Sequence, residues 1–396
     1  MAYVQNVKNL QGILIKHIEN LDFEILQNIV SNNKYVILTN HSNEIARGGG
    51  FENFLAACND VRSLKEDYYK FGFLCFEIFH RNFKTHPQNE PIVNFPLIHF
   101  FNPEELITFN QLTNFNPSCK PKISKFKLQF TQFEYIKIVQ NLLQHIQKGD
   151  IYEINFCFHL EANGYIKPVD TYLILNHFSP SPFSCFVKYE NLYLLSASPE
   201  RFLQLKGNSL ISQPIKGTAK RSKDEMEDKF LAENLRKSKK ERSENVMIVD
   251  LVRNDLAMIC EPGTVCVEEL FGIYSYKHVH QMISTVVGKK VKDIPWLGCV
   301  EHLFPMGSMT GAPKHKAIEL ITKYEPLKRG LFSGSVGYVK PNGDFDFNVV
   351  IRSILYDDSC GKILINVGSA ITAYSNPKQE YEECLLKAHA LLKIFN

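Results

Sequence analysis

Apolar residues recur at helical spacing just after residue 130, and the pattern then becomes an alternating one. The first pattern predicts an amphipathic helix over 132–148, which Thr131 and Glu134 begin as a capping box. The second predicts a strand over 151–160, in which the even-numbered positions are apolar and the odd-numbered positions are mixed. The mixed side of this strand then carries Glu153, Asn155, Cys157 and His159.

Turn residues predict two hairpins. Gly207-Asn208-Ser209 separates two strand-like segments, and a three-residue loop there would pair Glu200 with Lys216. A two-residue loop would shift the register by one position and put the two side chains on opposite faces. The second turn, Asn342-Gly343, separates strands over 334–340 and 344–355. Period two places three side chains on one face of the later strand: Asp346, Asn348 and Arg352.

Carboxylates stand at the starts of two predicted helices. The last helix begins at Asn376-Pro377, so Glu380 and Glu383 lie on one helical face. Two interpretations of this pair are open: a solvent-exposed face that meets nearby lysines, or oxygen ligands of a divalent cation. Glu244 opens another helical segment, which extends to Leu256.

Two further segments are candidates for chemistry. Residues 307–314 are rich in small residues and precede a predicted helix, where exposed backbone N–H groups bind anions; an ordinary helix start has the same pattern. Lys216 lies close in sequence to Lys220 and Arg221. Cationic neighbours would lower its pKa and favour the free amine, whereas the alternative is a solvated surface lysine.

Composition limits the class of protein. The 396 residues allow two domains or one large one, and the polar stretch 114–122 is the candidate boundary. Scattered charges with a net charge of +3 argue against a nucleic-acid partner. No apolar run would span a membrane and no signal sequence is evident, so a cytoplasmic protein without membrane contact is expected. The ten cysteines form no Cys-x-x-Cys pair and no glutamine-hydrolysing thiol elbow, which indicates reduced core residues.

Short motifs follow one another from residue 132 to the C-terminus. They are 149–155, 198–202, 214–218, 244–256, 307–314, 329–330, 334–338, 346–352 and 380–383. Together and in this order, they resemble the motifs of the chorismate-binding enzymes. That family includes anthranilate synthase component I, aminodeoxychorismate synthase component I, isochorismate synthase and salicylate synthase. The resemblance covers about two thirds of the chain.

The resemblance implies an α+β fold, in which two large antiparallel β-sheets pack as a sandwich with helices outside. Residues 1–115, which carry no motif, would complete the sheets. Residues 125–396 would form the chorismate-binding catalytic region, and the two parts would make one intertwined body.

The resemblance also implies roles for individual residues. Glu244, Glu380 and Glu383 would hold Mg²⁺, which clamps the ring carboxylate of chorismate and assists loss of its 4-hydroxyl. Thr310 and Gly311 would lie near the same ring carboxylate. The enolpyruvyl carboxylate would be held by three groups: Arg352, Tyr338 and the backbone near Gly368.

Lys216 points to one branch of the family, because aminodeoxychorismate synthases carry a lysine there and anthranilate synthases a small alanine. In that branch the lysine attacks ring C2, Glu200 assists loss of the 4-hydroxyl, and ammonia attacks C4 to give 4-amino-4-deoxychorismate, the precursor of para-aminobenzoate in folate biosynthesis. The ammonia would come from a separate glutamine amidotransferase subunit. The alternatives are anthranilate synthase component I and a non-catalytic homologue that docks an amidotransferase.

The chain departs from the family pattern at three places. Glu153 stands where isochorismate and salicylate synthases carry a lysine base. Gln281 stands where the family usually has a histidine, and His280, one residue earlier, is a candidate replacement that would contact the substrate. The small-residue loop reads Gly368-Ser369-Ala370, which keeps small side chains but has less backbone freedom.

Overall fold

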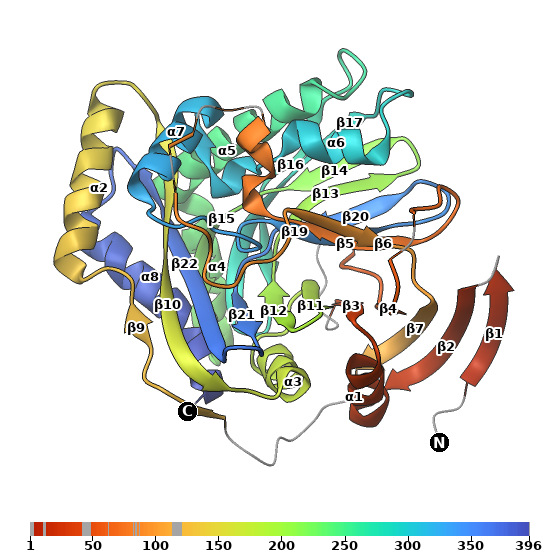
Figure 1. Ribbon diagram of the computed structural model, residues 1–396. Helices are drawn as coiled ribbons and strands as arrows, with labels where there is room; N and C mark the ends of the chain where they lie inside the picture. The colour runs from red at the N-terminus through yellow and green to blue at the C-terminus, as the bar shows by residue number, and fades with distance from the viewer. Residues whose placement is uncertain are drawn as a thin grey trace.

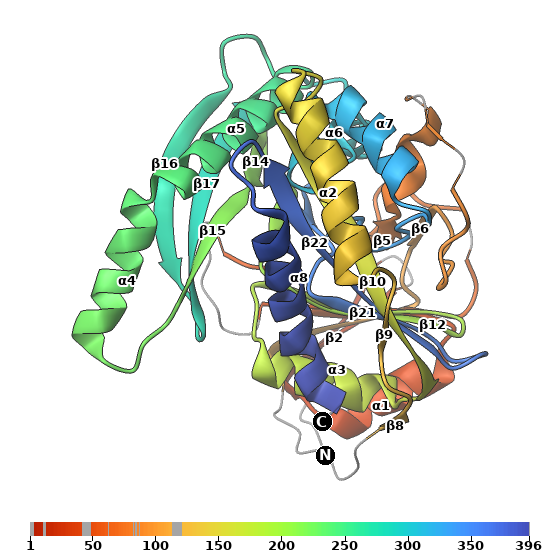
Figure 2. The same cartoon turned by 90° about the vertical axis from the view of Figure 1, so that its left-hand side faces the viewer.

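The strands form two large sheets and the helices lie outside them. The computed structural model describes residues 4–10, 13–41, 49–61, 63–81, 83, 85, 86, 88–112 and 121–395. In this part of the chain the two sheets pack together, as Figure 1 and Figure 2 show from two sides. The predicted α+β sandwich is confirmed.

The larger sheet has 13 described strands and is antiparallel except where β2 and β7 run parallel. Strands β8 and β9 pair with β10 beside the main path. In spatial order the main path is β1 (Val4–Leu10), β2 (Ile13–Leu21), β7 (Glu105–Leu112), β4 (Phe54–Cys58), β3 (Tyr35–Asn40), β11 (Phe183–Tyr189), β12 (Leu192–Ser198), β21 (Ser353–Asp357), β22 (Lys362–Thr372), β10 (Glu153–Tyr165) and β18 (Gly311–Ala312), with β8 at Lys122–Ile123 and β9 at Lys127–Leu128.

The smaller sheet has nine described strands, all paired antiparallel. In spatial order they are β15 (Ile215–Lys220), β17 (Val279–Lys289), β14 (Ser209–Gln213), β13 (Arg201–Lys206), β20 (Phe345–Asn348), β19 (Ser335–Val339), β5 (Lys70–Leu74) and β6 (Ile98–Phe101), with β16 (Cys266–Ser275) pairing to β17. Strands β5 and β6 thus belong to this sheet, whereas β1 to β4 and β7 belong to the larger one. The first 112 residues therefore contribute strands to both sheets.

Helices cover the outer faces. Helices α2 and α8 lie side by side over β10 and β22 (Figure 2), where Tyr135 and Tyr381 pack against Phe158 at ring-centroid distances of 5.4 and 6.0 Å. Helices α4 and α5 pack on β15, β16 and β17. The described helices are α1 (Phe23–Asn32), α2 (Gln132–Gln147), α3 (Pro168–Phe178), α4 (Glu225–Lys237), α5 (Lys239–Ala257), α6 (Trp296–Leu303), α7 (Lys314–Tyr324) and α8 (Pro377–Leu392), with 3-10 turns η1 (Phe76–Arg81), η2 (Gly307–Met309) and η3 (Lys393–Phe395).

A buried ion pair stands within the smaller sheet. Arg201 of β13 donates from Nε and from a terminal nitrogen to the two carboxylate oxygens of Asp346 on β20, both at 3.0 Å. The guanidinium also donates to Gln213 Oε1 at 2.6 Å and to the Gly49 carbonyl at 2.9 Å. Both charged side chains are at most 2% exposed, so the pair is held in a region where an unpaired charge would be costly.

Several local predictions are confirmed. Helix α2 begins at Gln132 with the complete Thr131–Glu134 capping box, and the Asn376 side chain caps α8. The cysteines that the structure describes form no disulfide, and all are buried except Cys266 and Cys360. No described helix is long and apolar enough to cross a membrane. The proposed boundary at 114–122 lies almost wholly outside the described residues.

Two register predictions are wrong. The first hairpin closes with a two-residue turn, because Lys206 pairs with Ser209 and Leu205 with Leu210. In the second, β20 ends at Asn348, the chain crosses to the larger sheet, and β21 begins only at Ser353. Arg352 lies in this crossing with φ of 51°, so it does not share a strand face with Asp346 and Asn348.

Candidate active site

Lys216 and Glu153 form a buried ion pair between the two sheets. Lys216 Nζ of β15 donates to Glu153 Oε1 at the first residue of β10. The pairing of β15 with β17 shifts between Ile215 and Thr218, and Gly217 there has φ of +91°. Such bulges redirect side chains. The structure thus brings together a strand from each sheet at one lysine. The sequence placed Glu153 on the mixed face of its strand but gave no sign that it pairs with Lys216.

The charge environment of Lys216 is acidic. Burial lowers the pKa of Lys216, but Glu153, Glu244 and Glu200 together outweigh burial and raise it overall. The predicted lowering by cationic neighbours is wrong, because Lys220 is exposed and Arg221 is paired with Asp228 at 2.9 Å. Lys216 therefore rests as an ammonium ion.

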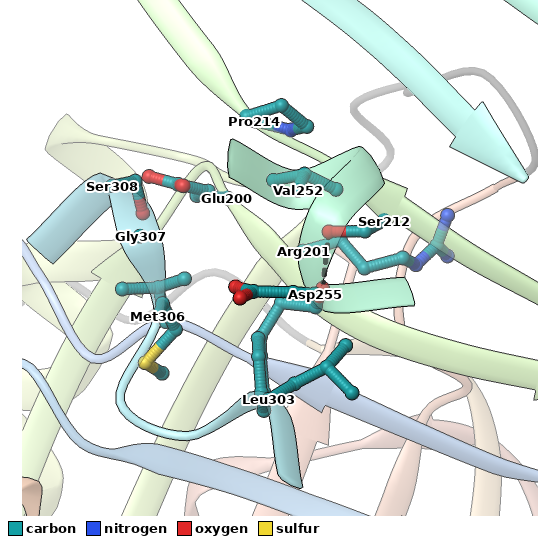
Figure 3. Close-up of a pocket in the computed structure, with 12 residues that line it drawn as sticks. Glu200, Arg201, Ser212, Pro214, Val252, Asp255, Leu303, Met306, Gly307 and Ser308 are labelled. Atoms are coloured by element: carbon teal, nitrogen blue, oxygen red, sulfur yellow. Dashed lines mark hydrogen bonds between the residues drawn. The ribbon is translucent and has the colours of Figure 1, made fainter. Parts of the chain in front are cut away.

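Glu200 lies close enough to Lys216 for their charges to interact, and it lines a cleft. Burial raises the pKa of Glu200 to about 7, although a hydrogen bond with Ser308 and the charge of Lys216 oppose the rise. Glu200 is near Lys216 as predicted, but not as its partner in a ladder, since β15 pairs with β17. Figure 3 shows Glu200 and Ser308 together at one side of a small cleft, whose apolar wall includes Val252, Leu303 and Met306.

The three predicted metal ligands come from two helices. Burial raises the pKa of Glu244 on α5 to about 7. Burial and the charge of Glu383 also raise the pKa of Glu380 on α8. Glu383 differs, because its Oε1 lies 2.8 Å from Lys387 Nζ and this lysine keeps its pKa low in spite of burial. Glu383 thus meets a nearby lysine, as the first interpretation of the α8 pair expects. Glu380 is only 4% exposed, so it does not belong to a solvent-exposed face.

The donor chemistry of these carboxylates suits a hard cation. In the described part of the chain, no three Asp, Glu, His or Cys side chains are close enough together to hold a metal as they stand. Nevertheless, raised pKa values at Glu244 and Glu380 mark buried carboxylates that lack sufficient positive charge. Oxygen ligands of this kind are those that Mg²⁺ and Ca²⁺ prefer. The donor atoms therefore fit a divalent cation, although the side chains would have to move closer together to hold one.

The Gly-rich segment precedes a helix as predicted, because α7 begins at Lys314. The segment itself forms η2 and then the short strand β18. Asn155 N donates to the Thr310 carbonyl at 2.7 Å, and Tyr152 N donates to the Ala312 carbonyl at 2.7 Å. A Cβ at Gly311 would lie 2.1 Å from the Glu153 carbonyl oxygen. The segment is therefore pinned to β10 beside Glu153, and the predicted Thr310 and Gly311 lie there.

Arg352 and Gly368 lie towards α8. The Arg352 guanidinium has no hydrogen-bond or ion-pair partner among the described residues, and burial lowers its pKa although Glu383 opposes the effect. An unpaired, mostly buried guanidinium suits a carboxylate ligand. Gly368 faces Cys157 across the β10–β22 pairing, and its carbonyl accepts from Lys387 Nζ at 2.9 Å. Lys387 thus joins Gly368 to Glu383.

The structure places Tyr338 elsewhere. Tyr338 lies among aromatic rings, 5.0 Å from Phe54 and 5.7 Å from Phe51 between ring centroids. Its hydroxyl accepts from Glu52 N at 3.2 Å. No contact within the described residues joins it to Arg352 or Lys216.

His280 also lies outside the Lys216 cluster. Its Nδ1 contacts Ser275 Oγ at 2.7 Å and its Nε2 contacts Asp228 Oδ1 at 3.0 Å, so both ring nitrogens are occupied. The neighbouring Gln281 is 5% exposed, and its Oε1 has no hydrogen-bond partner among the described residues. His280 is therefore not placed as a substitute for the usual histidine.

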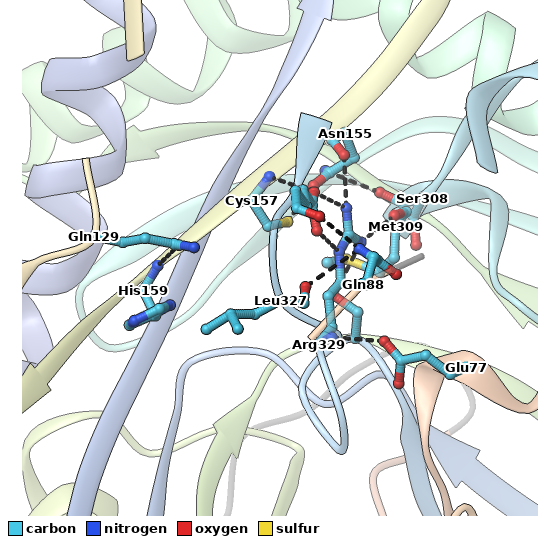
Figure 4. A network of polar contacts seen from close by, with 12 residues as sticks. Glu77, Gln88, Gln129, Asn155, Cys157, His159, Ser308, Met309, Leu327 and Arg329 are labelled. Carbon is cyan, nitrogen blue, oxygen red and sulfur yellow. Dashed lines mark hydrogen bonds and ion pairs between the residues drawn. The ribbon is translucent and has the colours of Figure 1, made fainter. Parts of the chain in front are cut away.

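Arg329 connects the walls of the site, a role that the sequence motif did not reveal. It donates to the Asn155 carbonyl at 2.8 Å and to the Met309 carbonyl at 2.7 Å (Figure 4). It also pairs with Glu325 at 2.6 Å. Glu77 of η1 accepts from Arg329 N at 2.6 Å. This network fixes β10, which carries Glu153, against η2, which carries Ser308.

A buried lysine among carboxylates, where a strand of each sheet meets, has the groups that proton transfer and nucleophilic attack require. The chain belongs to the chorismate binding enzyme family, whose pattern matches residues 19–393. 

The similar proteins carry the names of two enzymes, aminodeoxychorismate synthase and anthranilate synthase component 1. The chain is 44% identical to the chloroplastic aminodeoxychorismate synthase of Arabidopsis thaliana over 65% of its length and 28% of that protein. It is 35% identical to aminodeoxychorismate synthase component 1 of Bacillus subtilis (69% and 58% covered) and 37% identical to anthranilate synthase component 1 of Thermus thermophilus (68% and 58% covered). The aligned region thus spans well under two thirds of each relative.

A solved structure has the same fold. Anthranilate synthase component I from Streptococcus pneumoniae superposes with a TM-score of 0.73 at 22% identity, covering 91% of this chain and 92% of the other.

Proposed function

We propose that the chain aminates chorismate at C4 to 4-amino-4-deoxychorismate, as an aminodeoxychorismate synthase component I. The observation that supports this most is the buried Lys216 beside Glu200 in a chain of the chorismate binding enzyme family. A lysine nucleophile turns a direct substitution at C4 into two displacements on the ring.

In the proposed reaction, two displacements on the chorismate ring follow one another. The Lys216 amine attacks C2 while the C4–O bond breaks, and Glu200 gives its proton to the departing hydroxyl, which leaves as water. Ammonia attacks C4 while the bond between C2 and Lys216 breaks, and the new C4 ammonium returns a proton to Glu200. Arg352 would bind a carboxylate of chorismate throughout.

The metal and the partner are parts of the same proposal. Glu244, Glu380 and Glu383 would hold Mg²⁺, which when bound supplies positive charge at the ring carboxylate. Ammonia would come from a separate glutamine amidotransferase subunit, in keeping with the lack of a thiol elbow in the sequence. The similarity to the Thermus protein favours the alternative, anthranilate synthase component I. That activity would not use the buried Lys216 as a nucleophile.

Product identification tests the proposal. The purified chain is incubated with chorismate, Mg²⁺ and an ammonium salt, with and without an aminodeoxychorismate lyase, and the products are separated and weighed by mass spectrometry. We expect a product that the lyase converts to para-aminobenzoate. Anthranilate would establish the alternative activity, and unchanged chorismate even with an amidotransferase present would indicate a non-catalytic homologue.

The pH profile should report Glu200. Because the acid must be protonated and its pKa is about 7, kcat of the wild type should fall as the pH rises above that value. Glu200→Gln should lower kcat by about 10²-fold or more and remove this limb. The measurement is kcat against pH, with the exposed Glu233→Gln on α4 as a control. An unchanged alkaline limb in Glu200→Gln would assign the acid to another group.

Binding of Mg²⁺ should strengthen as the pH rises. Glu244 must lose its proton to ligate the ion, and its pKa is raised to about 7, so protons compete with metal below that value. We expect the apparent dissociation constant for Mg²⁺ to fall by about tenfold from about pH 6 to about pH 8, as measured by calorimetry. Glu244→Gln should bind Mg²⁺ weakly at every pH. Affinity independent of pH in the wild type would contradict this assignment.

A further inference from the structure

Lys216 must shed a proton before it can act as a nucleophile. An ammonium nitrogen has no lone pair, and the carboxylates around Lys216 favour the charged form. Because the lysine is buried, the proton must pass first to a neighbouring group of the site. This inference rests on the proposed function, since it concerns the start of the amination reaction.

Glu153 is the group placed to receive that proton. Its Oε1 accepts a hydrogen bond from Lys216 Nζ, and it is the only carboxylate of the described residues that does so. The other acidic groups whose charge reaches Lys216 make no such contact in the described part of the chain. They are Glu200 before β13, Glu241 and Glu244 on α5 and Glu383 on α8.

The backbone around Glu153 is unusually well fixed. Glu153 pairs with Ala312 of β18 and with Thr372 of β22, so its strand has a neighbour on each side. Two residues later, the Asn155 carbonyl accepts from Arg329. This pairing fixes the backbone from which the Glu153 carboxylate reaches Lys216, and general acid–base catalysis requires such positioning.

We propose that Glu153 is the catalytic base that takes the proton from the Lys216 ammonium and returns it at the end of each cycle. An N–H bond of Lys216 breaks and an O–H bond forms on Glu153, which leaves a neutral amine and a neutral carboxylic acid. The amine then attacks C2. When the bond to C2 breaks in the second displacement, the lysine leaves as an amine and recovers its proton from Glu153, so protons and charges balance.

The isosteric variant Glu153→Gln tests the proposal. It keeps the shape and a hydrogen-bonding group but cannot accept the proton. We expect kcat to fall by about 10²- to 10³-fold at neutral pH, while KM for chorismate changes by less than about threefold. Because Lys216 must then lose its proton to solvent, the fraction of free amine rises about tenfold per pH unit and offsets the loss of protonated Glu200 above about pH 7. The alkaline fall in kcat that is expected for the wild type should therefore be absent in Glu153→Gln.

Two further variants separate a chemical role from a structural one. Glu241→Gln removes a nearby carboxylate that does not touch Lys216, and its kcat should stay within about threefold of the wild type. Glu153→Ala leaves space for a small acid, and added formate should restore part of its activity. Circular dichroism and thermal unfolding show whether each variant is folded.

The outcomes distinguish the two proposals. If the wild type forms 4-amino-4-deoxychorismate and folded Glu153→Gln matches it in rate and pH profile, Glu153 is not the base. If Glu153→Gln is slow but has the wild-type pH profile, and formate does not restore Glu153→Ala, the residue has only a positioning role and the proposal fails. If the wild type forms no such product, the proposed function itself fails. The Lys216 pKa, measured by competitive labelling of its amine, should still be lower in Glu153→Gln, and an unchanged value would overturn the coupling of the two side chains.

Discussion

Lys216→Ala is expected to abolish amination at C4, with kcat lowered by about 10³-fold or more, because the variant has no nucleophile for the first displacement. Chorismate should still bind, since Arg352 and the carboxylates of α5 and α8 are unchanged. The measurement is single-turnover product formation together with the intact mass of the quenched wild-type enzyme, in which a chorismate-derived adduct on Lys216 should be found.

Lys220→Ala is the matched control for that experiment, because Lys220 lies on the same strand but is exposed. It should retain the wild-type kcat. Amination at more than a tenth of the wild-type rate in Lys216→Ala would show that ammonia displaces the hydroxyl without a covalent step.

Arg201→Met is expected to destabilise the fold by about 3–5 kcal/mol, the usual effect of removing one partner of a buried ion pair. Asp346 would remain buried with only the Gln204 amide, at 2.9 Å, as a side-chain hydrogen-bond donor among the described residues. The measurement is urea unfolding at equilibrium, and the exposed Lys206→Met on the same strand is the control.

The double variant Arg201→Met with Asp346→Leu should be more stable than Arg201→Met alone, because it leaves no isolated charge in the interior. If the double variant loses as much as the sum of the two single variants, the ion pair is not the source of the effect. Packing of the long arginine side chain would then be responsible.

Local signals in the sequence predicted those parts of the fold that depend on neighbours along the chain. The capping box and apolar periodicity of α2 and the Asn376-Pro377 start of α8 depend on residues within one or two turns, and both helices begin where predicted. The alternation after residue 151 likewise placed Glu153 and Asn155 on one side of β10, where both contact the site. These features need no knowledge of distant strands.

Apart from the loop length of the first hairpin, the failures concern partners that are distant in sequence. Lys216 takes its charge environment from Glu153 and Glu244, not from Lys220, so the direction of its pKa shift was predicted wrongly. Arg352 left the predicted strand because the chain changes sheets after Asn348, which alternation alone does not reveal. The motifs from the family resemblance supplied Lys216, Glu200 and the α5 and α8 carboxylates, although their assigned roles await the experiments above.

Strand order in the two sheets also dictates when the protein can fold during its synthesis. Strand β3 lies between β4 and β11, and β5 pairs with β19, whose residues 335–339 emerge from the ribosome long after β5. The apolar strands of the first hundred residues therefore lack their partner strands until most of the chain has been translated. Holding that nascent segment apart from other chains is a task for chaperones, and expression without them should give aggregates of incomplete chains.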